Sequence, residues 1–220
     1  AAPDWQKHTE ELIAYPLLPG TPGLTIDDSG APQWHFDVES PEYAASLGSF
    51  LAELHTVAPE AVRGSEISEY SPAEIRQRKR DDIDQVASEF DVAPHLLRRW
   101  TAWLDDDSYW PTFTTVTHGE VYPAHQLMDG PVNLSILDWT TASIGDPARD
   151  FIFHHSSVSA SAFEATTARY VEAGGRVWPR FAEHCGELYS MSPVELGLFA
   201  LQTEVPEYLD AAKAQLNPND

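Results

Sequence analysis

The chain has 220 residues, enough for a well-packed core, and its composition is that of a folded globular protein. Its formal net charge of −22 argues against a nucleic acid or an anionic membrane as partner, because phosphate groups are bound by basic surfaces. Cys185 is the single cysteine, which excludes an internal disulfide, and no apolar run approaches the roughly 20 residues that cross a bilayer, so we expect a cytoplasmic protein.

The first predicted element is a short strand over residues 11–15, which Pro16, Pro19 and Gly20 end. Apolar spacing then predicts helices over about 41–54, 72–90 and 94–104. Four helix starts place a capping side chain before a proline at the first helical position: Ser40-Pro41, Ser71-Pro72, Asp146-Pro147 and Ser192-Pro193. Ser71 with Glu74, and Ser192 with Glu195, also match the capping box.

The pattern changes over residues 111–139. Phe113 to Thr117 is rich in β-branched residues and leads directly into His118. The segments 126–129 and 133–137 flank Asp129-Gly130-Pro131, which predicts a β-hairpin. We expect this hairpin to present four polar side chains near one edge: His118, Glu120, His125 and Asp138.

Beyond Asp146 the pattern is helical again. An apolar stripe precedes Gly174-Gly175 and consists of Phe163, Thr167, Tyr170 and Val171. Further helices are predicted over about 177–189, 193–203 and 206–216. The expected fold class is therefore α+β and predominantly helical, with a small embedded hairpin.

Three motifs around the hairpin indicate a family. They are His118-Gly119-Glu120 with Pro123 and His125, then Leu137-Asp138-Trp139, then Gly145-Asp146-Pro147 with Asp150. Together they resemble the H-G-D-x-x-P-x-N/H, I-D-W/F and G-D-P-x-x-D motifs of the aminoglycoside phosphotransferase superfamily. The segments 12–20, 103–110 and 197–201 are similar to those of its macrolide 2′-phosphotransferase branch, so the resemblance runs through the whole chain.

The resemblance implies a protein-kinase-like fold. Residues 1–20 would be a remnant of the N-terminal lobe strand and the hinge, and residues 21–220 the helical C-terminal lobe. A complete enzyme also has an upstream lobe with a loop over the nucleotide and a phosphate-binding lysine, which nothing before Leu12 supplies. We therefore expect a fragment, with the N-terminal lobe as its missing partner, that binds substrate without turnover.

The resemblance also implies site roles. The full enzyme would transfer the γ-phosphate of GTP or ATP with the help of Mg²⁺. Glu120 would be the catalytic base and His118 would order its loop, while His125 and Asp138 would bind the metal, although magnesium prefers oxygen ligands. Leu127 and Leu137 would form an apolar floor beneath the nucleotide base, and Tyr15 and Leu17 would offer backbone groups of the hinge to it.

The implied acceptor is the 2′-hydroxyl of a macrolide antibiotic. A macrolide combines a large apolar ring with a cationic amino sugar, which aromatic walls with a few carboxylates would suit. The strongly acidic chain also suits a cationic substrate. The candidate pocket residues are Tyr122, Phe153, His154, Phe199 and Glu204, with Phe181 and Tyr189 as further candidates.

Two departures from the family pattern leave alternatives open. Glu120 stands where the family has Asp, and Ala124 where it usually has Gly. One extra methylene moves a carboxylate by about 1 Å, and a misplacement of that size can cost about a hundredfold in rate. A pseudokinase-like binding module is therefore one alternative, and an aminoglycoside, homoserine or other small-hydroxyl kinase is another. The absence of H-E-x-x-H and of G-x-S-x-G argues against zinc and serine hydrolases.

Overall fold

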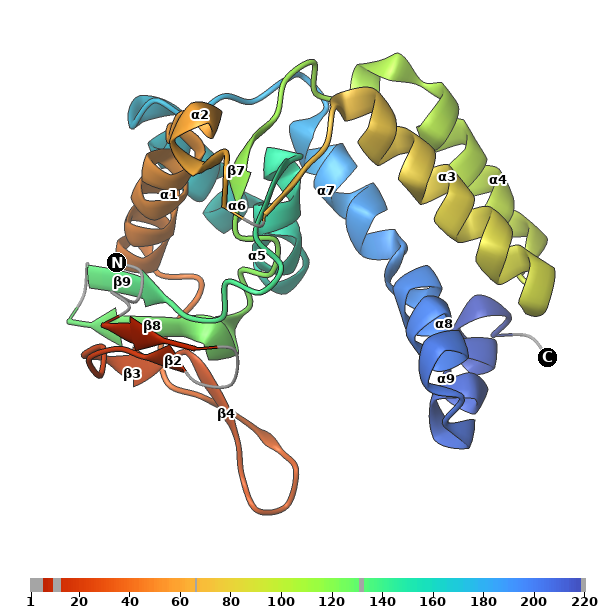
Figure 1. Cartoon of the computed structure of the whole chain (residues 1–220), viewed down its shortest axis with the longest axis horizontal. Helices are drawn as coiled ribbons and strands as arrows, with labels where there is room; N and C mark the ends of the chain where they lie inside the picture. Colours follow the sequence, from red (N-terminus) through yellow and green to blue (C-terminus); the bar gives the residue numbers. More distant parts are fainter. Residues whose placement is uncertain (1–5, 10–12, 66, 131–132, 219–220) are drawn as a thin grey trace. The chain divides into compact units, whose positions relative to one another are not determined.

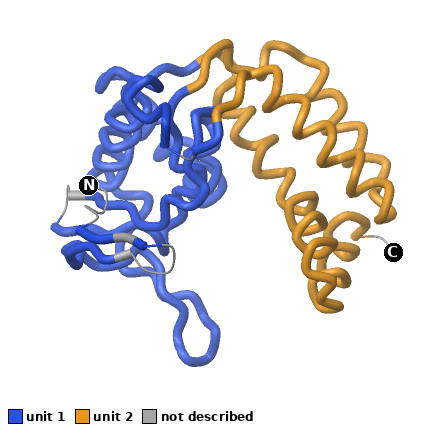
Figure 2. Tube along the Cα trace, viewed as in Figure 1, with its two compact units in different colours: residues 1–68, 115–177 blue, residues 69–114, 178–220 orange. Residues whose placement is uncertain are grey.

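A computed structural model describes residues 6–9, 13–65, 67–130 and 133–218. The chain forms two compact units, each built from two separate segments (Figure 2). Unit 1 consists of residues 1–68 and 115–177, and unit 2 of residues 69–114 and 178–220. Within the described residues, no helix is both long and apolar enough to cross a membrane.

The strands of unit 1, with β6 at its boundary, are short, and the pairs whose register is given are antiparallel (Figure 1). The central sheet has the order β3-β8-β9, with bounds Thr21–Pro22, Gln126–Asp129 and Asn133–Ile136. A second sheet has the order β6-β10-β7, with bounds Ser68–Glu69, Ser143–Gly145 and Thr115–Thr117. Two further pairs are β1 (Lys7–His8) with β2 (Ile13–Ala14), and β4 (Leu24–Ile26) with β5 (Pro32–Trp34).

Unit 1 also contains α-helices and 3-10 helices. They are α1 (Pro41–His55), α2 (Pro59–Val62), η2 (Pro123–His125), η3 (Pro147–Phe151), α5 (Ile152–Ser157) and α6 (Ala160–Glu172). The Ser40 side chain accepts the Tyr43 N–H and so caps α1, as predicted. α1 packs along α6 at Gly48, where an added Cβ would lie 2.6 Å from the Thr166 carbonyl oxygen. The glycine therefore allows the two helices to approach closely.

Unit 2 consists of α3 (Pro72–Glu89), α4 (Pro94–Asp105), η1 (Asp107–Tyr109), α7 (Phe181–Ser190), α8 (Ser192–Thr203) and α9 (Pro206–Leu216). Ser71 and Glu74 form the predicted capping box at the start of α3. The core of unit 2 contains Trp103, which stacks on Trp110 at 4.7 Å between ring centroids and donates a hydrogen bond from its indole N–H to His184. Such aromatic packing contributes a large buried apolar area.

The predicted fold class is confirmed, and so is the hairpin of β8 and β9, although residues 131–132 of its turn lie outside the described residues. Two details of the prediction are wrong. Ser192 lies within α8, which begins after Met191 without a side-chain cap, and Val171 is exposed rather than on the buried stripe. Residues 147–151 form a 3-10 helix before the short α5. Of the predicted strand 11–15, residues 11–12 lie outside the described residues and only Ile13–Ala14 forms β2.

Candidate functional site

The backbone of the loop that follows β7 is hydrogen-bonded to a buried carboxylate. Asp150 in η3 accepts the His118 backbone N–H at 2.9 Å on one oxygen and the Gly119 N–H at 2.6 Å on the other. Burial alone would raise the pKa of Asp150, but hydrogen bonds from His55 and from these two amides outweigh it, so its pKa is lowered. An ionised carboxylate therefore fixes the backbone at the start of the loop.

Gly119 is required by the shape of this loop. Its φ is +90°, and an added Cβ would lie 2.5 Å from the Thr141 carbonyl oxygen. Only glycine adopts this region without a steric cost. The Thr141 hydroxyl also donates to the His118 carbonyl oxygen at 2.9 Å. The segment around Thr141 thus packs directly against the loop at Gly119.

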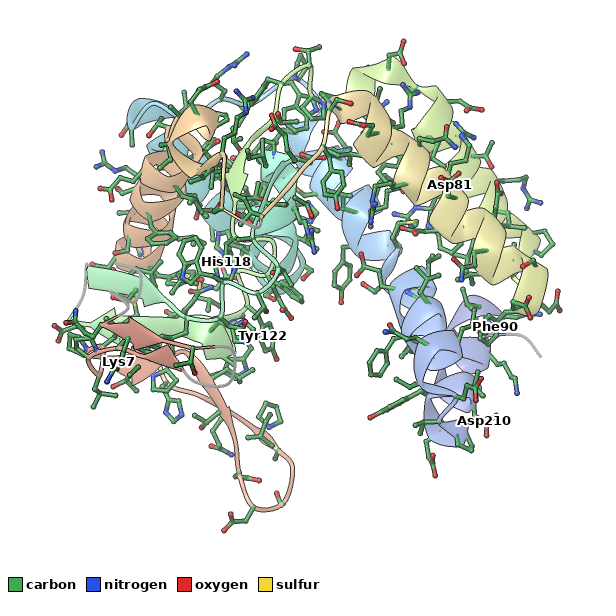
Figure 3. All side chains as sticks on the ribbon, in the orientation of Figure 1. Lys7, Asp81, Phe90, His118, Tyr122 and Asp210 are labelled. Atoms are coloured by element: carbon green, nitrogen blue, oxygen red, sulfur yellow. The ribbon has the colours of Figure 1, made fainter. Side chains whose placement is uncertain are left out.

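His118 lies in the interior of unit 1 and connects two segments by hydrogen bonds (Figure 3). Its Nδ1 accepts the Glu120 N–H at 3.2 Å, so Nε2 carries the proton and donates to the Leu137 carbonyl oxygen at 2.9 Å. Burial lowers the pKa of His118, against the opposing effect of Asp150. The imidazole therefore links the loop to the end of β9 and leaves neither nitrogen free for proton transfer.

The hairpin register brings His125 and Asp138 together. β8 and β9 pair with Gln126 opposite Ile136, and the Leu137 N–H donates to the His125 carbonyl oxygen at 2.8 Å. His125 enters the hairpin where Asp138 leaves it, and its Nε2 lies 3.9 Å from an Asp138 carboxylate oxygen. Antiparallel pairing thus makes neighbours of two residues that are distant in sequence.

Asp138 is held in an unusual conformation. It is one of two described non-glycine residues with positive φ, at 61°, and such residues cluster at functional sites. The Thr140 hydroxyl donates to its carboxylate at 2.5 Å and lowers the pKa of Asp138. The side chain is 44% exposed, so an ionised oxygen faces solvent beside His125.

Glu120 occupies the next position on the same loop and is half-buried. Its backbone is fixed on both sides, because its N–H donates to His118 and its carbonyl oxygen faces His125 Nδ1 at 3.3 Å. Its carboxylate makes no hydrogen bond to any described residue. The structure therefore offers a free carboxylate on an anchored backbone, close in the chain to the pair of His125 and Asp138.

The donor set fits a metal that is shared with phosphate groups. No cluster of three or more His, Cys, Asp or Glu side chains exists among the residues that the structure describes. Mg²⁺ typically uses one or two carboxylates and completes its shell with phosphate oxygens and water. Asp138 suits this role, whereas the imidazole of His125 is a poorer ligand for a hard cation.

The other predicted contacts are placed in different ways. Tyr122 is half-buried beside this pair, with its ring 6.0 Å from His125 and 5.1 Å from Phe153. His154 is buried and its Nε2 bonds the Thr166 hydroxyl at 2.7 Å, as in a packed core histidine. Phe199 and Glu204 are exposed residues of unit 2.

The predicted nucleotide contacts belong to unit 1. Leu127 is buried in β8 and Leu137 is half-buried directly after β9, so both lie at the hairpin. Tyr15 is 43% exposed and Leu17 is 95% exposed in the segment between β2 and β3. These two groups therefore differ sharply in burial.

Asp146 and Asp150 stabilise the fold by hydrogen bonds. The bond between Asp150 and His55 was not predicted from the sequence. Asp146 caps η3 by accepting the Ala148 N–H at 2.9 Å, as expected. Asp150 is in turn bonded to His55, the last residue of α1. The one signal in the sequence is a histidine that closes an apolar helix face, and this pattern does not reveal its partner.

Comparison with known proteins gives consistent results. A model of the phosphotransferase enzyme family matches residues 5–184. The macrolide 2′-phosphotransferase MphH from Brachybacterium faecium is 49% identical, and the match covers 100% of this chain and 74% of that one with a TM-score of 0.95. A type I macrolide 2′-phosphotransferase is 39% identical, with 98% and 72% covered and a TM-score of 0.90. The GDP and kanamycin complex of APH(2″)-IIia shares the fold at 14% identity, with 99% and 75% covered and a TM-score of 0.78.

Proposed function

The chain belongs to the phosphotransferase enzyme family, and we propose that it takes part in transferring the γ-phosphate of a nucleotide to the 2′-hydroxyl of a macrolide. The observation that carries the proposal is the arrangement around the hairpin. Glu120, His125 and Asp138 lie on two short segments that His118 joins by hydrogen bonds. Phosphoryl transfer depends mainly on such positioning and on charge stabilisation.

Each residue has a distinct role in this proposal. The free Glu120 carboxylate accepts a hydrogen bond from the acceptor hydroxyl. This bond orients the hydroxyl oxygen toward the γ-phosphorus. Asp138, with His125 beside it, would hold Mg²⁺, which would neutralise charge on the phosphate oxygens. His118 and Asp150 keep the loop in place and touch neither substrate. The proton of the hydroxyl passes to Glu120 as its oxygen bonds to the γ-phosphorus. The bond from that phosphorus to the bridging oxygen of the β-phosphate breaks, and the nucleoside diphosphate leaves with those electrons.

The donor is a nucleoside triphosphate, and we propose GTP before ATP. The nucleotide base would lie over the hairpin at Leu127 and Leu137, next to the metal site. The solved complex of APH(2″)-IIia with GDP shares the fold of this chain, and the preference for GTP follows from the resemblance to the macrolide branch. Tyr15 and Leu17, whose side chains are exposed, would offer backbone groups to the base.

The macrolide proposal rests on the identity to two macrolide 2′-phosphotransferases and on the local chemistry. Tyr122 and Phe153 form an aromatic surface beside His125, suited to an apolar ring. The charge of −22 attracts a cationic amino sugar at long range.

Titration with Mg²⁺·GTP and Mg²⁺·ATP tests the metal and nucleotide part. In Asp138→Asn the carboxylate is lost, and we expect the affinity to fall at least about tenfold, the loss of one charged interaction. Asp129→Asn is the matched control, because Asp129 is an exposed carboxylate on the turn of the same hairpin. Equal affinities of the two variants would remove Asp138 from the metal site.

A further inference from the structure

A chain of buried polar contacts leads from the helices of unit 1 to the loop. The hydroxyl of Tyr170 in α6 lies 2.8 Å from Nδ1 of His55, at the end of α1. His55 Nε2 lies 3.0 Å from an Asp150 oxygen, and Asp150 accepts the His118 and Gly119 amides. All three side chains are buried. These contacts therefore connect α1 and α6 to the backbone that carries Glu120.

Asp150 needs this support. A buried carboxylate is costly unless hydrogen-bonded donors surround it. Among the described residues, His55 is the one side chain that donates to it, and the other donors are loop amides. His55 is therefore the side chain through which α1 supports this carboxylate.

Tyr170 fixes the orientation of that imidazole. Its hydroxyl oxygen accepts a backbone hydrogen bond from Arg176, so its own proton can serve His55 Nδ1. Burial raises the pKa of Tyr170 to about 12, which keeps this proton in place. Gly175 clears the space for the ring, because an added Cβ would lie 2.3 Å from it. With Nδ1 occupied in this way, Nε2 is turned toward Asp150.

We propose that His55 and Tyr170 are positioning residues, through which the packed pair of α1 and α6 sets the place of the catalytic loop. The close approach of the helices at Gly48 brings Tyr170 within reach of His55. The effect on catalysis rests on the proposed phosphotransfer function, whereas the effect on the loop does not. The two can therefore be tested separately.

The test measures the Gly119 amide by NMR in the whole chain. Its bond to Asp150 is 2.6 Å, so its proton resonance should lie far downfield and its exchange with solvent should be slow. Tyr170→Phe removes one oxygen and keeps the ring packing. We expect Gly119 and His118 to exchange about 2- to 10-fold faster, the effect of one hydrogen bond, and the Gly119 resonance to move upfield. Exchange in α9 should not change.

Ser190→Ala is the control for general destabilisation. It removes a hydroxyl that accepts the Trp100 indole N–H at 3.0 Å in unit 2. We expect no selective change at Gly119 in this variant. If Tyr170→Phe leaves Gly119 unchanged, or changes all amides as Ser190→Ala does, the positioning role is wrong.

A second pair of variants separates hydrogen bonding from packing. His55→Gln retains an amide that can donate to Asp150, and His55→Leu has no donor. The Gly119 resonance should stay near its original position in the first variant and move upfield in the second. Equal shifts in the two would contradict the proposal. A response at Gly119 in a protein that binds no Mg²⁺·GTP would uphold the positioning role and refute the proposed function.

Discussion

Replacing Gly119 by alanine tests the geometry of the loop, and Gly30→Ala supplies a matched control. Both glycines have positive φ, +90° and +84°. An added Cβ at Gly119 would lie 2.5 Å from the Thr141 carbonyl oxygen, whereas at Gly30 nothing lies within 4 Å. The two variants therefore share the backbone strain and differ in the clash.

The expected magnitudes follow from these two terms. A left-handed conformation costs a non-glycine residue about 1–2 kcal/mol, and both variants are destabilised by this amount. The smaller entropy of the unfolded alanine chain offsets about 0.4–1 kcal/mol in both and cancels in the comparison. Overpacking costs about 1–3 kcal/mol more and applies to Gly119 alone. Gly119→Ala should therefore be less stable than Gly30→Ala by about 1–3 kcal/mol.

Urea unfolding of the two variants and the wild type measures this difference. Because the clash also pushes the loop away from Thr141, Gly119→Ala should weaken the hydrogen bonds of its amide to Asp150, which NMR can detect. Equal unfolding free energies for the two variants would refute the reasoning, since they would show that the loop relaxes without cost.

Three further predictions concern the base, a buried histidine and the helix caps. Glu120→Asp should raise the rate of phosphate transfer in any context where transfer is measurable, and an equal or lower rate would count against Glu120 as the base. Burial lowers the pKa of His154 to about 4, so its stabilising effect is complete above its unfolded pKa of about 6.5 and is lost as the pH falls toward 4. Lowering the pH from about 7.5 to about 5 should thus cost the wild type about 2 kcal/mol more than His154→Gln, and parallel unfolding curves would contradict this. Ser71→Ala should cost about 1 kcal/mol and Ser192→Ala less than about 0.5 kcal/mol, because only the first removes a formed cap, so equal losses in thermal unfolding would be inconsistent with the structure.

Local rules predicted most of the fold. The cap at Ser71, the helix over 72–89 and the hairpin of β8 and β9 follow from residue type and spacing, because their interactions join residues close in sequence. Ser192 has the same spacing to a proline and a glutamate as Ser71, yet it does not cap. Glu195 instead bonds Lys79 of α3 at 3.0 Å, a tertiary contact that no local pattern contains.

The candidate site was predictable where the hairpin register decides it. His125 and Asp138 meet because antiparallel strands place their outer ends side by side. The contact of His55 with Asp150 was not predictable, since 95 residues separate them and both are hidden in the core. Burial of His154 likewise depends on α6 packing, which the sequence alone does not specify.

Calorimetric titration with erythromycin, with kanamycin as the control, tests the proposed substrate most directly. We expect saturable binding of erythromycin, no binding of kanamycin, and weaker erythromycin binding after Tyr122→Ala because of the lost aromatic contact. Tight binding of kanamycin with no heat from erythromycin would contradict the macrolide assignment and transfer the proposal to an aminoglycoside acceptor.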